Sequence, residues 1–231
     1  MSSPDALRHP PLRSFGRIKS RAVKPRQAAL FDTLLPTIRL PDPAAGPIDP
    51  AALMPGATEV WLEIGFGGGE HLAAQAARNP RALMIGCEPF INGVASALRH
   101  VEEGGLTNVR LHADDARAVV TALPDASLDR VMILFPDPWH KARHNKRRLI
   151  QPDFAAELAR VLKPGGRLRF VTDWKDYADQ ALERLLKTPG LTWLAEVADD
   201  WRTAPADHVV TRYEEKKLGD SPPIFLEFRR D

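Results

Sequence analysis

Short apolar runs alternate with amphipathic segments from residue 59 to the end of the chain. Runs with the length and composition of buried strands lie at residues 60–64, 82–87, 109–113, 128–135, 167–172, 191–197 and 224–229. Between them, apolar residues recur three or four positions apart, which predicts helices at residues 70–78, 91–103, 116–123, 152–162 and 176–186. Short strands that alternate with helices form a parallel sheet covered on both faces, so the pattern predicts an α/β fold.

Proline and glycine divide the chain into three parts. Residues 1–40 are basic and contain scattered prolines, so we expect a largely flexible N-terminal extension with one short helix at 27–35. Residues 41–58 form a connector rich in proline and glycine, and residues 59–231 form the α/β domain. A domain of this length can bury a core of its own.

Acids or a glycine loop follow five of the predicted strands. These positions are Gly65, Glu88, Asp115, Asp137 and Asp173. In open α/β sheets the ligand lies outside the carboxyl ends of the strands. We therefore expect these residues to form the rim of a single pocket.

The first of these strand ends carries a glycine-rich loop at residues 65–69. Ordinary tight turns also use such loops, but an acid at the end of the next strand, here Glu88, commonly binds a ribose diol. A nicotinamide dinucleotide would need glycine where the chain has Glu70, and Glu63 and Glu70 would repel a pyrophosphate. The acids suit S-adenosylmethionine, which carries a cationic amino group and a sulfonium. Glu63 would face its methionine end, Glu88 its ribose and Asp115 its adenine.

Asp137 lies between Pro136 and Pro138, directly after the strand at 128–135. The prolines stop the strand and stiffen the chain, so a carboxylate and the indole of Trp139 are held at a strand end. This position makes Asp137 the candidate for chemistry on a bound ligand.

Positive charge is concentrated in two stretches, although the formal net charge is only +2. Residues 8–26 contain seven Lys and Arg residues and no acid, and residues 141–148 contain five and no acid. Clustered cations attract a polyanion such as a nucleic acid. For either stretch alone, a solvated tail or loop is the simpler interpretation.

Composition restricts where the protein works. The single cysteine, Cys87, excludes an internal disulfide and fits a reducing cytoplasm. No apolar run approaches the roughly 18–20 residues of a membrane span, and the start lacks a secretory signal, although its arginine content also suits a transit peptide. His140 and His144 have the spacing of a helical zinc pair, but the cations around them oppose a dication, so we expect no metal.

The chain resembles the bacterial tRNA (guanine-N7-)-methyltransferases over roughly residues 13–230. The resemblance rests on Arg13-Ser14-Phe15, residues 63–69, Glu88-Pro89, Asp115-Ala116, Thr172-Asp173, residues 211–214 and, most specifically, the PDPW tract at 136–139 with the basic residues after it. It implies a Rossmann-like class I methyltransferase fold, with a seven-stranded, mostly parallel sheet, helices on both faces and an antiparallel last strand. It also implies methyl transfer from S-adenosylmethionine to N7 of a guanine in the variable loop of tRNA.

The resemblance implies a role for each matching residue. The cofactor site would contain Glu63, Gly65, Gly67, Glu88, Asp115 and Asp137, and Asp137 would also be catalytic. Contacts to the substrate would come from Lys141, Asp173, Thr211, Arg212, Tyr213 and Glu214. Contacts to RNA would come from Arg143, His144, Asn145, Lys146, Arg147 and Arg148. The chain departs from the family at Ala142, where a second lysine is usual, and so carries one cation fewer.

Guanine N7 is unprotonated at neutral pH, so the reaction needs no general base. A fixed carboxylate near the ring would stabilise the positive charge that methylation creates. Asp137 is the candidate, with Asp173 or Glu214 as helper. Because N7 is hard to reach in an A-form groove, the base should be unstacked, and the aromatic residues that could stack on it are Trp139, Trp174 and Tyr213.

Three other functions stay open at this point. The chain could methylate a small molecule or a protein, bind RNA with a vestigial pocket, or be a nicotinamide oxidoreductase. The intact acid series argues against the second and Glu70 against the third. We expect a cytoplasmic tRNA-modifying enzyme without membrane contact, as a monomer or weak homodimer.

Overall fold

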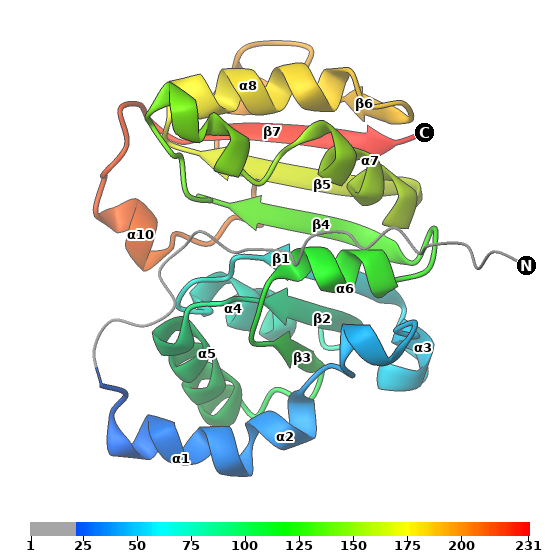
Figure 1. The fold of residues 1–231 in the computed structure, drawn as a ribbon, viewed down its shortest axis with the longest axis vertical. Helices are drawn as coiled ribbons and strands as arrows, with labels where there is room; N and C mark the ends of the chain where they lie inside the picture. Colours follow the sequence, from blue (N-terminus) through cyan, green and yellow to red (C-terminus); the bar gives the residue numbers. More distant parts are fainter. Residues whose placement is uncertain (1–21) are drawn as a thin grey trace, which may run out of the picture.

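The computed structural model describes residues 22–231 and is built on one seven-stranded sheet (Figure 1). Along the sheet the strand order is β3-β2-β1-β4-β5-β7-β6. The strands are β1 (Glu59–Ile64), β2 (Ala82–Cys87), β3 (Val109–His112), β4 (Leu128–Leu134), β5 (Leu162–Thr172), β6 (Leu191–Trp193) and β7 (Ile224–Arg230). Strands β1 to β5 pair in parallel, whereas β7 is antiparallel to both β5 and β6. The mostly parallel sheet with an antiparallel last strand is confirmed.

Helices cover both faces of the sheet, as predicted. The helices within the alternating pattern are α4 (Glu70–Arg78), α5 (Ile91–Gly104), α6 (Ala116–Ala122), α7 (Pro152–Val161) and α8 (Lys175–Leu186). Side chains of α6, α7 and α8 share one apolar cluster with Leu62, and those of α4 and α5 share another with its strand neighbour Trp61. Because successive strand residues point to opposite faces, β1 contributes to both clusters.

Two element boundaries differ from the predicted ones. Strand β5 begins at Leu162 rather than at residue 167, where the prediction placed its start, and it therefore includes the glycines at 165 and 166. An irregularity in its pairing with β4 between Leu128 and Arg130 accommodates the extra residues. Strand β6 is only three residues long, because it lies at the sheet edge and pairs only with β7.

Residues 25–58, expected as flexible chain, one short helix and a connector, pack against the sheet domain. They contain α1 (Pro25–Thr33), α2 (Leu35–Ile38), the 3-10 helix η1 (Pro43–Ala45) and α3 (Pro50–Leu53). Leu30, Leu35 and Ile38 are buried in the cluster of α4 and α5, and Ile48 is buried on the opposite face. These few apolar anchors, spaced between prolines, show no clear periodicity in the sequence. The part of the first basic stretch before residue 22 lies outside the described residues.

The segment between β6 and β7 crosses the carboxyl edge of the sheet. It contains α9 (Asp199–Arg202) and α10 (Arg212–Glu215), and α10 lies beyond the tips of the parallel strands (Figure 1). Among the described helices, none combines the length and apolar content that crossing a bilayer requires.

Candidate active site

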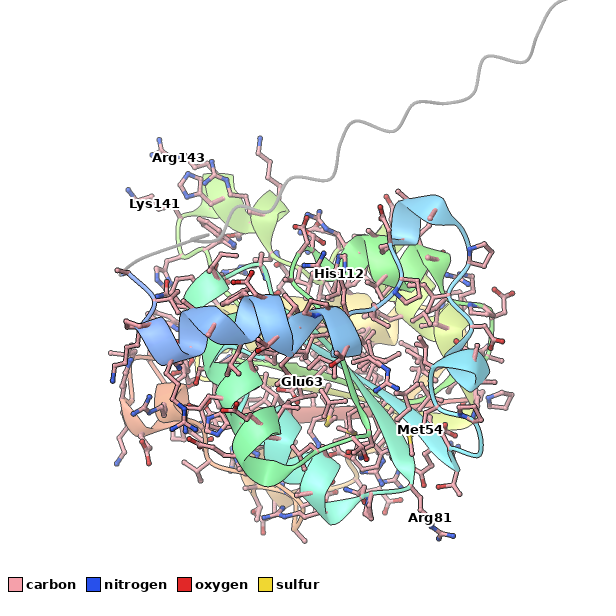
Figure 2. All side chains as sticks on the ribbon, turned by 90° about the horizontal axis from the view of Figure 1, so that it is seen from below. Met54, Glu63, Arg81, His112, Lys141 and Arg143 are labelled. Carbon is pink, nitrogen blue, oxygen red and sulfur yellow. The ribbon has the colours of Figure 1, made fainter. Side chains whose placement is uncertain are left out.

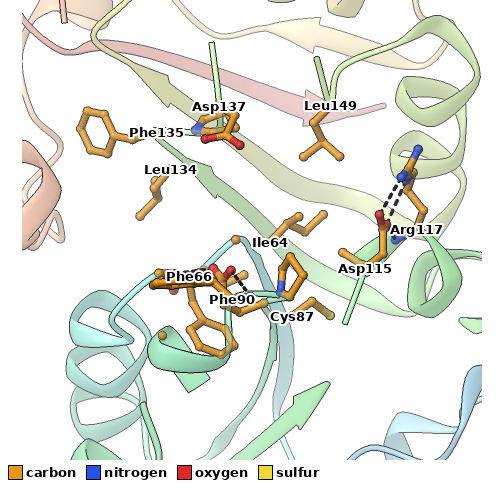
Figure 3. A pocket seen from close by; sticks show the side chains of 18 of the residues that line it. Ile64, Phe66, Cys87, Phe90, Asp115, Arg117, Leu134, Phe135, Asp137 and Leu149 are labelled. Atoms are coloured by element: carbon orange, nitrogen blue, oxygen red, sulfur yellow. Dashed lines mark hydrogen bonds and ion pairs between the residues drawn. The ribbon is translucent and has the colours of Figure 1, made fainter. Parts of the chain in front are cut away.

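A cleft of about 1890 Å³ opens at the carboxyl ends of the strands, next to the reversal of strand order between β1 and β4 (Figure 3). Four acids line it: Glu63 of β1 and the predicted strand-end acids Glu88, Asp115 and Asp137. The fifth predicted strand-end position, Asp173, is buried and does not line the cleft. The predicted cofactor glycines Gly65 and Gly67 line it as well. The structure therefore brings together all the residues that we assigned to a cofactor site.

The glycine loop and Glu88 form one hydrogen-bonded unit. Gly65 and Gly67 have φ angles of 74° and 53°, a conformation that side chains other than glycine rarely adopt. The backbone N–H of Gly67 donates to Oε2 of Glu88 at 2.7 Å, and that of Phe90 donates to Oε1 at 2.9 Å. Burial raises the pKa of Glu88 to about 7, although these two hydrogen bonds act in the opposite direction. Each carboxylate oxygen can still accept a second hydrogen bond, which suits the two hydroxyls of a ribose.

Glu63 is held by a buried histidine of α4. The Glu63 side chain is 2% exposed, and its Oε2 lies 2.7 Å from Nδ1 of His71, which is 1% exposed. On the other side of the ring, Nε2 lies 3.2 Å from the amide nitrogen of Gln75, which also donates to the carbonyl of Asp207 at 2.7 Å. Since an amide nitrogen only donates, Nε2 of His71 accepts and its Nδ1 carries the proton that Glu63 receives.

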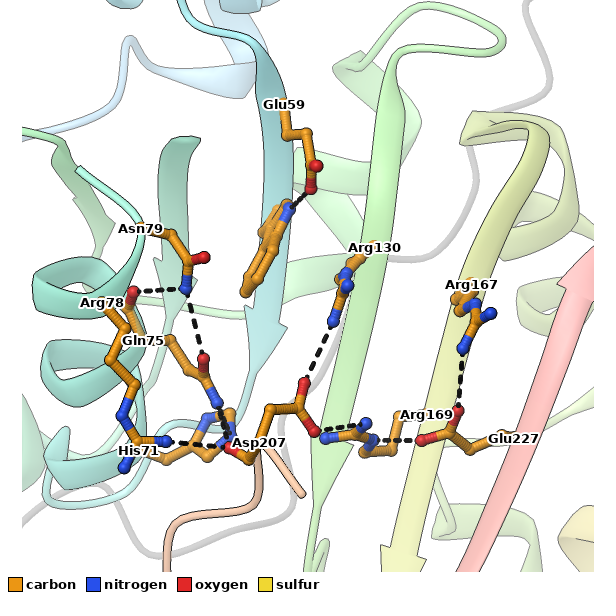
Figure 4. A network of polar contacts seen from close by, with 11 residues as sticks. Glu59, His71, Gln75, Arg78, Asn79, Arg130, Arg167, Arg169, Asp207 and Glu227 are labelled. Carbon is orange, nitrogen blue, oxygen red and sulfur yellow. Dashed lines mark hydrogen bonds and ion pairs between the residues drawn. The ribbon is translucent and has the colours of Figure 1, made fainter. Parts of the chain in front are cut away.

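Asp207 connects this chain of contacts to strands β4, β5 and β7 (Figure 4). Its carboxylate accepts from Arg130 of β4 at 3.1 Å and pairs with Arg169 of β5 at 2.8 Å. Arg169 in turn donates to Glu227 of β7 at 2.6 Å. Burial acts to raise the pKa of Asp207, but Arg169 and Arg130 outweigh it and hold that pKa below its usual value. The network fixes the chain four residues before Thr211.

The Asp115 carboxylate is hydrogen-bonded to the helix that follows it, α6. Its Oδ1 accepts from the backbone N–H of Arg117 at 2.9 Å and caps α6, and its two oxygens also accept from the Arg117 guanidinium at 2.9 and 2.6 Å (Figure 3). Burial opposes the effect, but these hydrogen bonds lower the pKa of Asp115. The part of the cleft next to Asp115 is thus bordered by an ion pair rather than a lone carboxylate.

Asp137 projects into the cleft from a strained loop. The residues on either side of the Pro-Asp-Pro tract, Phe135 and Trp139, have φ angles of 50° and 44°. For bulky residues this left-handed conformation costs about 1–3 kcal/mol each and persists only where the surroundings impose it. Within residues 22–231, Asp137 forms no hydrogen bond or ion pair, and although its side chain is exposed to the cleft, partial desolvation by the surrounding loop raises the pKa of its carboxyl. Its carboxylate is available to a ligand.

Only part of the predicted substrate set lines the cleft. Thr211, Arg212 and Tyr213 of the α10 region do so. Asp173 is buried behind them and accepts from the Tyr213 hydroxyl at 3.5 Å, and burial raises its pKa. Two further residues do not reach the cleft: Glu214 pairs with His208 at 2.8 Å, and Lys141 is exposed outside it.

The basic tract forms a short 3-10 helix, η2 (Ala142–Arg147), at the mouth of the cleft. Lys141 and Arg143 project away from the body of the molecule (Figure 2), and Lys146 is also exposed. Arg147 lines the cleft with its guanidinium 5.2 Å from the Trp139 ring centre. The partly buried His144 meets the same ring edge-on at 6.2 Å, and Asn145 is partly buried next to it in the chain.

Arg148 differs from the other cations of the tract in being buried. It is 2% exposed, and its guanidinium is hydrogen-bonded inside the protein. The sequence shows six polar residues in a row, but burial depends on how the loop packs against α8.

Comparison with known proteins decides the family. A family described as "Putative methyltransferase" matches residues 57–225. The tRNA (guanine-N(7)-)-methyltransferase of Caulobacter vibrioides (strain NA1000 / CB15N) is 67% identical over 222 residues, which cover 96% of both chains. The chain belongs to the tRNA (guanine-N(7)-)-methyltransferase family. The relative of that name from Hyphomonas neptunium is 52% identical and matches 94% of this chain and 99% of its own.

Two solved structures share the fold of this tRNA (guanine-N(7)-)-methyltransferase family member. A variant of the 16S rRNA (adenine(1408)-N(1))-methyltransferase of Catenulisporales acidiphilia has a TM-score of 0.52 at 18% identity, over 78% of this chain and 88% of its own. An rRNA methylase from Streptococcus thermophilus has a TM-score of 0.52 at 12% identity, over 75% and 87%. At such low identity these matches show the class I methyltransferase fold alone.

Sequence patterns give no role to His71, Gln75 or Asp207 in this family member. His71 and Gln75 are four residues apart on α4, so the helical period places them on one face. That spacing is the only sequence signal for the pair. Asp207 lies more than 130 residues away in a segment without clear periodicity, and only the fold brings it to them.

Proposed function

We propose that the protein transfers a methyl group from S-adenosylmethionine to N7 of a guanine in tRNA. The observation that carries this proposal is the position of Asp137. Its carboxylate, which has no hydrogen-bond or ion-pair partner among the described residues, lines the same cleft as the acids of the cofactor set and lies next to the cations of η2. The names of its relatives support the same reaction.

The carboxylates of the cleft fit the cationic groups and hydroxyls of S-adenosylmethionine and disfavour a dinucleotide. Glu63, Glu88 and Glu70 surround the glycine loop, and the Glu70 carboxylate folds back to within 2.4–2.8 Å of where a Cβ on Gly68 would lie. A pyrophosphate there would meet carboxylates instead of free backbone donors. We assign Glu63, Gly65, Gly67, Glu88, Asp115 and Asp137 to the bound cofactor, which would supply an electrophilic methyl group on a sulfonium.

The protein's contribution to the reaction is alignment and electrostatics. The Asp137 carboxylate would lie near the purine and stabilise the positive charge that develops on it. It can also accept hydrogen bonds from N1–H and the exocyclic amine of guanine, which adenine does not present in that pattern. The rings of Trp139 and Tyr213 border the same part of the cleft and offer stacking surfaces for an unstacked base.

The exposed cations of η2 would bind the phosphates around the target base. Arg143→Met and Lys146→Met are expected to weaken tRNA binding, because each removes a charge that releases counterions from the RNA. The plot of log K against log salt concentration has a negative slope, and each substitution should make that slope shallower by about 0.7–0.9. Binding titrations at several salt concentrations measure this slope, and an unchanged slope in both variants would show that RNA binds elsewhere.

Nucleoside composition tests the proposed reaction directly. Unmodified tRNA incubated with the protein and methyl-labelled S-adenosylmethionine should yield labelled 7-methylguanosine. A label in another nucleoside, or none above a control without enzyme, would refute the proposal. Transcripts in which single guanines are replaced by adenine would then locate the target, which we place in the variable loop. We also propose that the protein acts in the cytoplasm as a monomer or weak homodimer.

A further inference from the structure

We propose that Arg148 is a positioning residue that fixes the Asp137 loop against α8, and that it is not an RNA contact. The inference rests on the proposed function, because it assumes that the place of Asp137 sets the rate of methyl transfer.

Arg148 binds directly to the loop that carries Asp137. Its Nε donates to the carbonyl oxygen of Pro138 at 2.7 Å. Pro136 and Pro138 have no N–H, so the tract around Asp137 is poor in backbone donors and must be held mainly through its carbonyls. This hydrogen bond is one residue from Asp137.

The rest of the guanidinium is anchored in helix α8. Nη1 donates to the side-chain oxygen of Gln180 at 3.2 Å, and Nη2 donates to the carboxylate of Asp176. The guanidinium carbon lies 4.9 Å from the ring centre of Tyr177. The Tyr177 hydroxyl also accepts from the backbone N–H of Leu149 at 3.0 Å, which ties down the end of the same tract.

Arg148 borders the cleft, but its guanidinium is turned to Pro138, Gln180 and Asp176 and would have to leave these partners to bind a phosphate. A buried guanidinium that loses its partners is strongly destabilising, so this arrangement resists rearrangement. The neighbouring cations Arg143 and Lys146 are exposed, in contrast. The basic tract therefore has an outer set of cations that face solvent and one inner arginine that joins the catalytic loop to α8.

Asp176 offers a variant that separates the two roles. Its side chain is 69% exposed, and without it Arg148 keeps its hydrogen bonds to Pro138 and Gln180, so replacing Asp176 should not prevent folding. Removing an acid cannot remove an RNA contact made by a cation, and the loss of negative charge would, if anything, favour a polyanion. If Arg148 positions Asp137, however, loss of its partner should slow the reaction. Asp179 on the same helix is 64% exposed and pairs with Lys175, which makes it a matched control.

The experiment compares Arg148→Met, Asp176→Ala, Asp176→Asn and Asp179→Ala in the full-length protein. We expect Arg148→Met and Asp176→Ala to lower kcat at saturating tRNA by about 10- to 100-fold, as small misplacements of reacting groups do. Asp176→Asn keeps one acceptor oxygen and should retain more activity than Asp176→Ala. Asp179→Ala should match the wild type. The salt slope of tRNA binding should be unchanged in all four variants, unlike that of Arg143→Met.

Two results would overturn the inference. One is a negative salt slope that becomes shallower by about 0.7–0.9 in Arg148→Met, which would make Arg148 a phosphate contact. The other is a wild-type kcat in Asp176→Ala, which also decides the matter if Arg148→Met fails to fold. A wild-type protein without 7-methylguanosine activity would refute the proposed function instead, and the salt slopes, measured without methyl transfer, would still show whether Arg148 contacts RNA.

Discussion

Replacing Asp137 with alanine is expected to lower kcat by about 100- to 1000-fold and to leave the affinity for tRNA within about twofold of the wild type. Asp137 combines three features: it lines the cleft, it has no partner among residues 22–231, and the residues around it are held in a strained conformation. A charge that is already in place when the transition state forms needs no reorganisation, and losing one such group usually costs that much in rate.

The measurement is single-turnover methyl transfer at saturating S-adenosylmethionine, alongside tRNA binding by the same protein. Asp137→Asn tests the charge itself, since it keeps the shape of the side chain. Asp153 is the matched control, because it also lines the cleft but lies at the start of α7. We expect Asp153→Asn to remain active. Equal losses of kcat and tRNA affinity in Asp137→Ala would show that Asp137 supports the loop rather than the reaction.

The sequence predicts the frame of this site because strand ends and breakers are local signals. Glu63, Glu88, Asp115 and Asp137 each follow or end a short apolar run, and parallel strands bring such residues to one edge whatever the details of packing. The same reasoning predicts a parallel sheet with helices on both faces, whereas the antiparallel direction of the last strand is implied only by the resemblance to the methyltransferase family. It does not need the identity of a single long-range contact.

What a residue does at that edge depends on contacts that the sequence pattern does not contain. Asp115 and Asp137 look equivalent in the sequence. In the structure, however, Asp115 pairs with Arg117, whereas Asp137 has no hydrogen-bond or ion-pair partner among the described residues. Arg147 and Arg148 are adjacent and identical, yet only Arg148 is buried, because α8 presents Asp176 and Gln180 to it. Charge patterning gives the sign of a surface, whereas the side of the loop on which each cation lies is set by tertiary packing.

The network from Glu63 to Asp207 connects the part of the cleft around the glycine loop with the segment that leads to Thr211. Glu63 belongs to the cofactor set, and Asp207 lies just before the part of the chain that contains Thr211 and Tyr213. His71 and Gln75 bridge them within the protein interior. The histidine therefore contacts Glu63, which we propose binds the cofactor, and through Gln75 it is connected to the segment that contains Thr211 and Tyr213.

Replacing His71 with alanine is expected to weaken binding of S-adenosylmethionine by about 10- to 100-fold. Without the Nδ1 proton, the buried Glu63 carboxylate loses its 2.7 Å partner and is no longer held for the amino group of the cofactor. Hydrogen bonds to charged groups contribute roughly 1.5–3 kcal/mol, which sets the scale of the loss. Calorimetric titration with S-adenosylmethionine and with its demethylated product measures it without methyl transfer.

The control is His71→Asn, whose amide nitrogen can donate from nearly the position of Nδ1. It should bind the cofactor more tightly than His71→Ala, and the two variants should differ less in kcat at saturating cofactor than in KM for it. Such a split is the mark of a residue that acts on binding in the ground state and transition state alike. Equal affinities in His71→Ala and the wild type would show that Glu63 is held without the histidine. A loss confined to kcat would instead place His71 in the chemistry of the reaction, and the bridge from Glu63 to Asp207 would then need a different explanation.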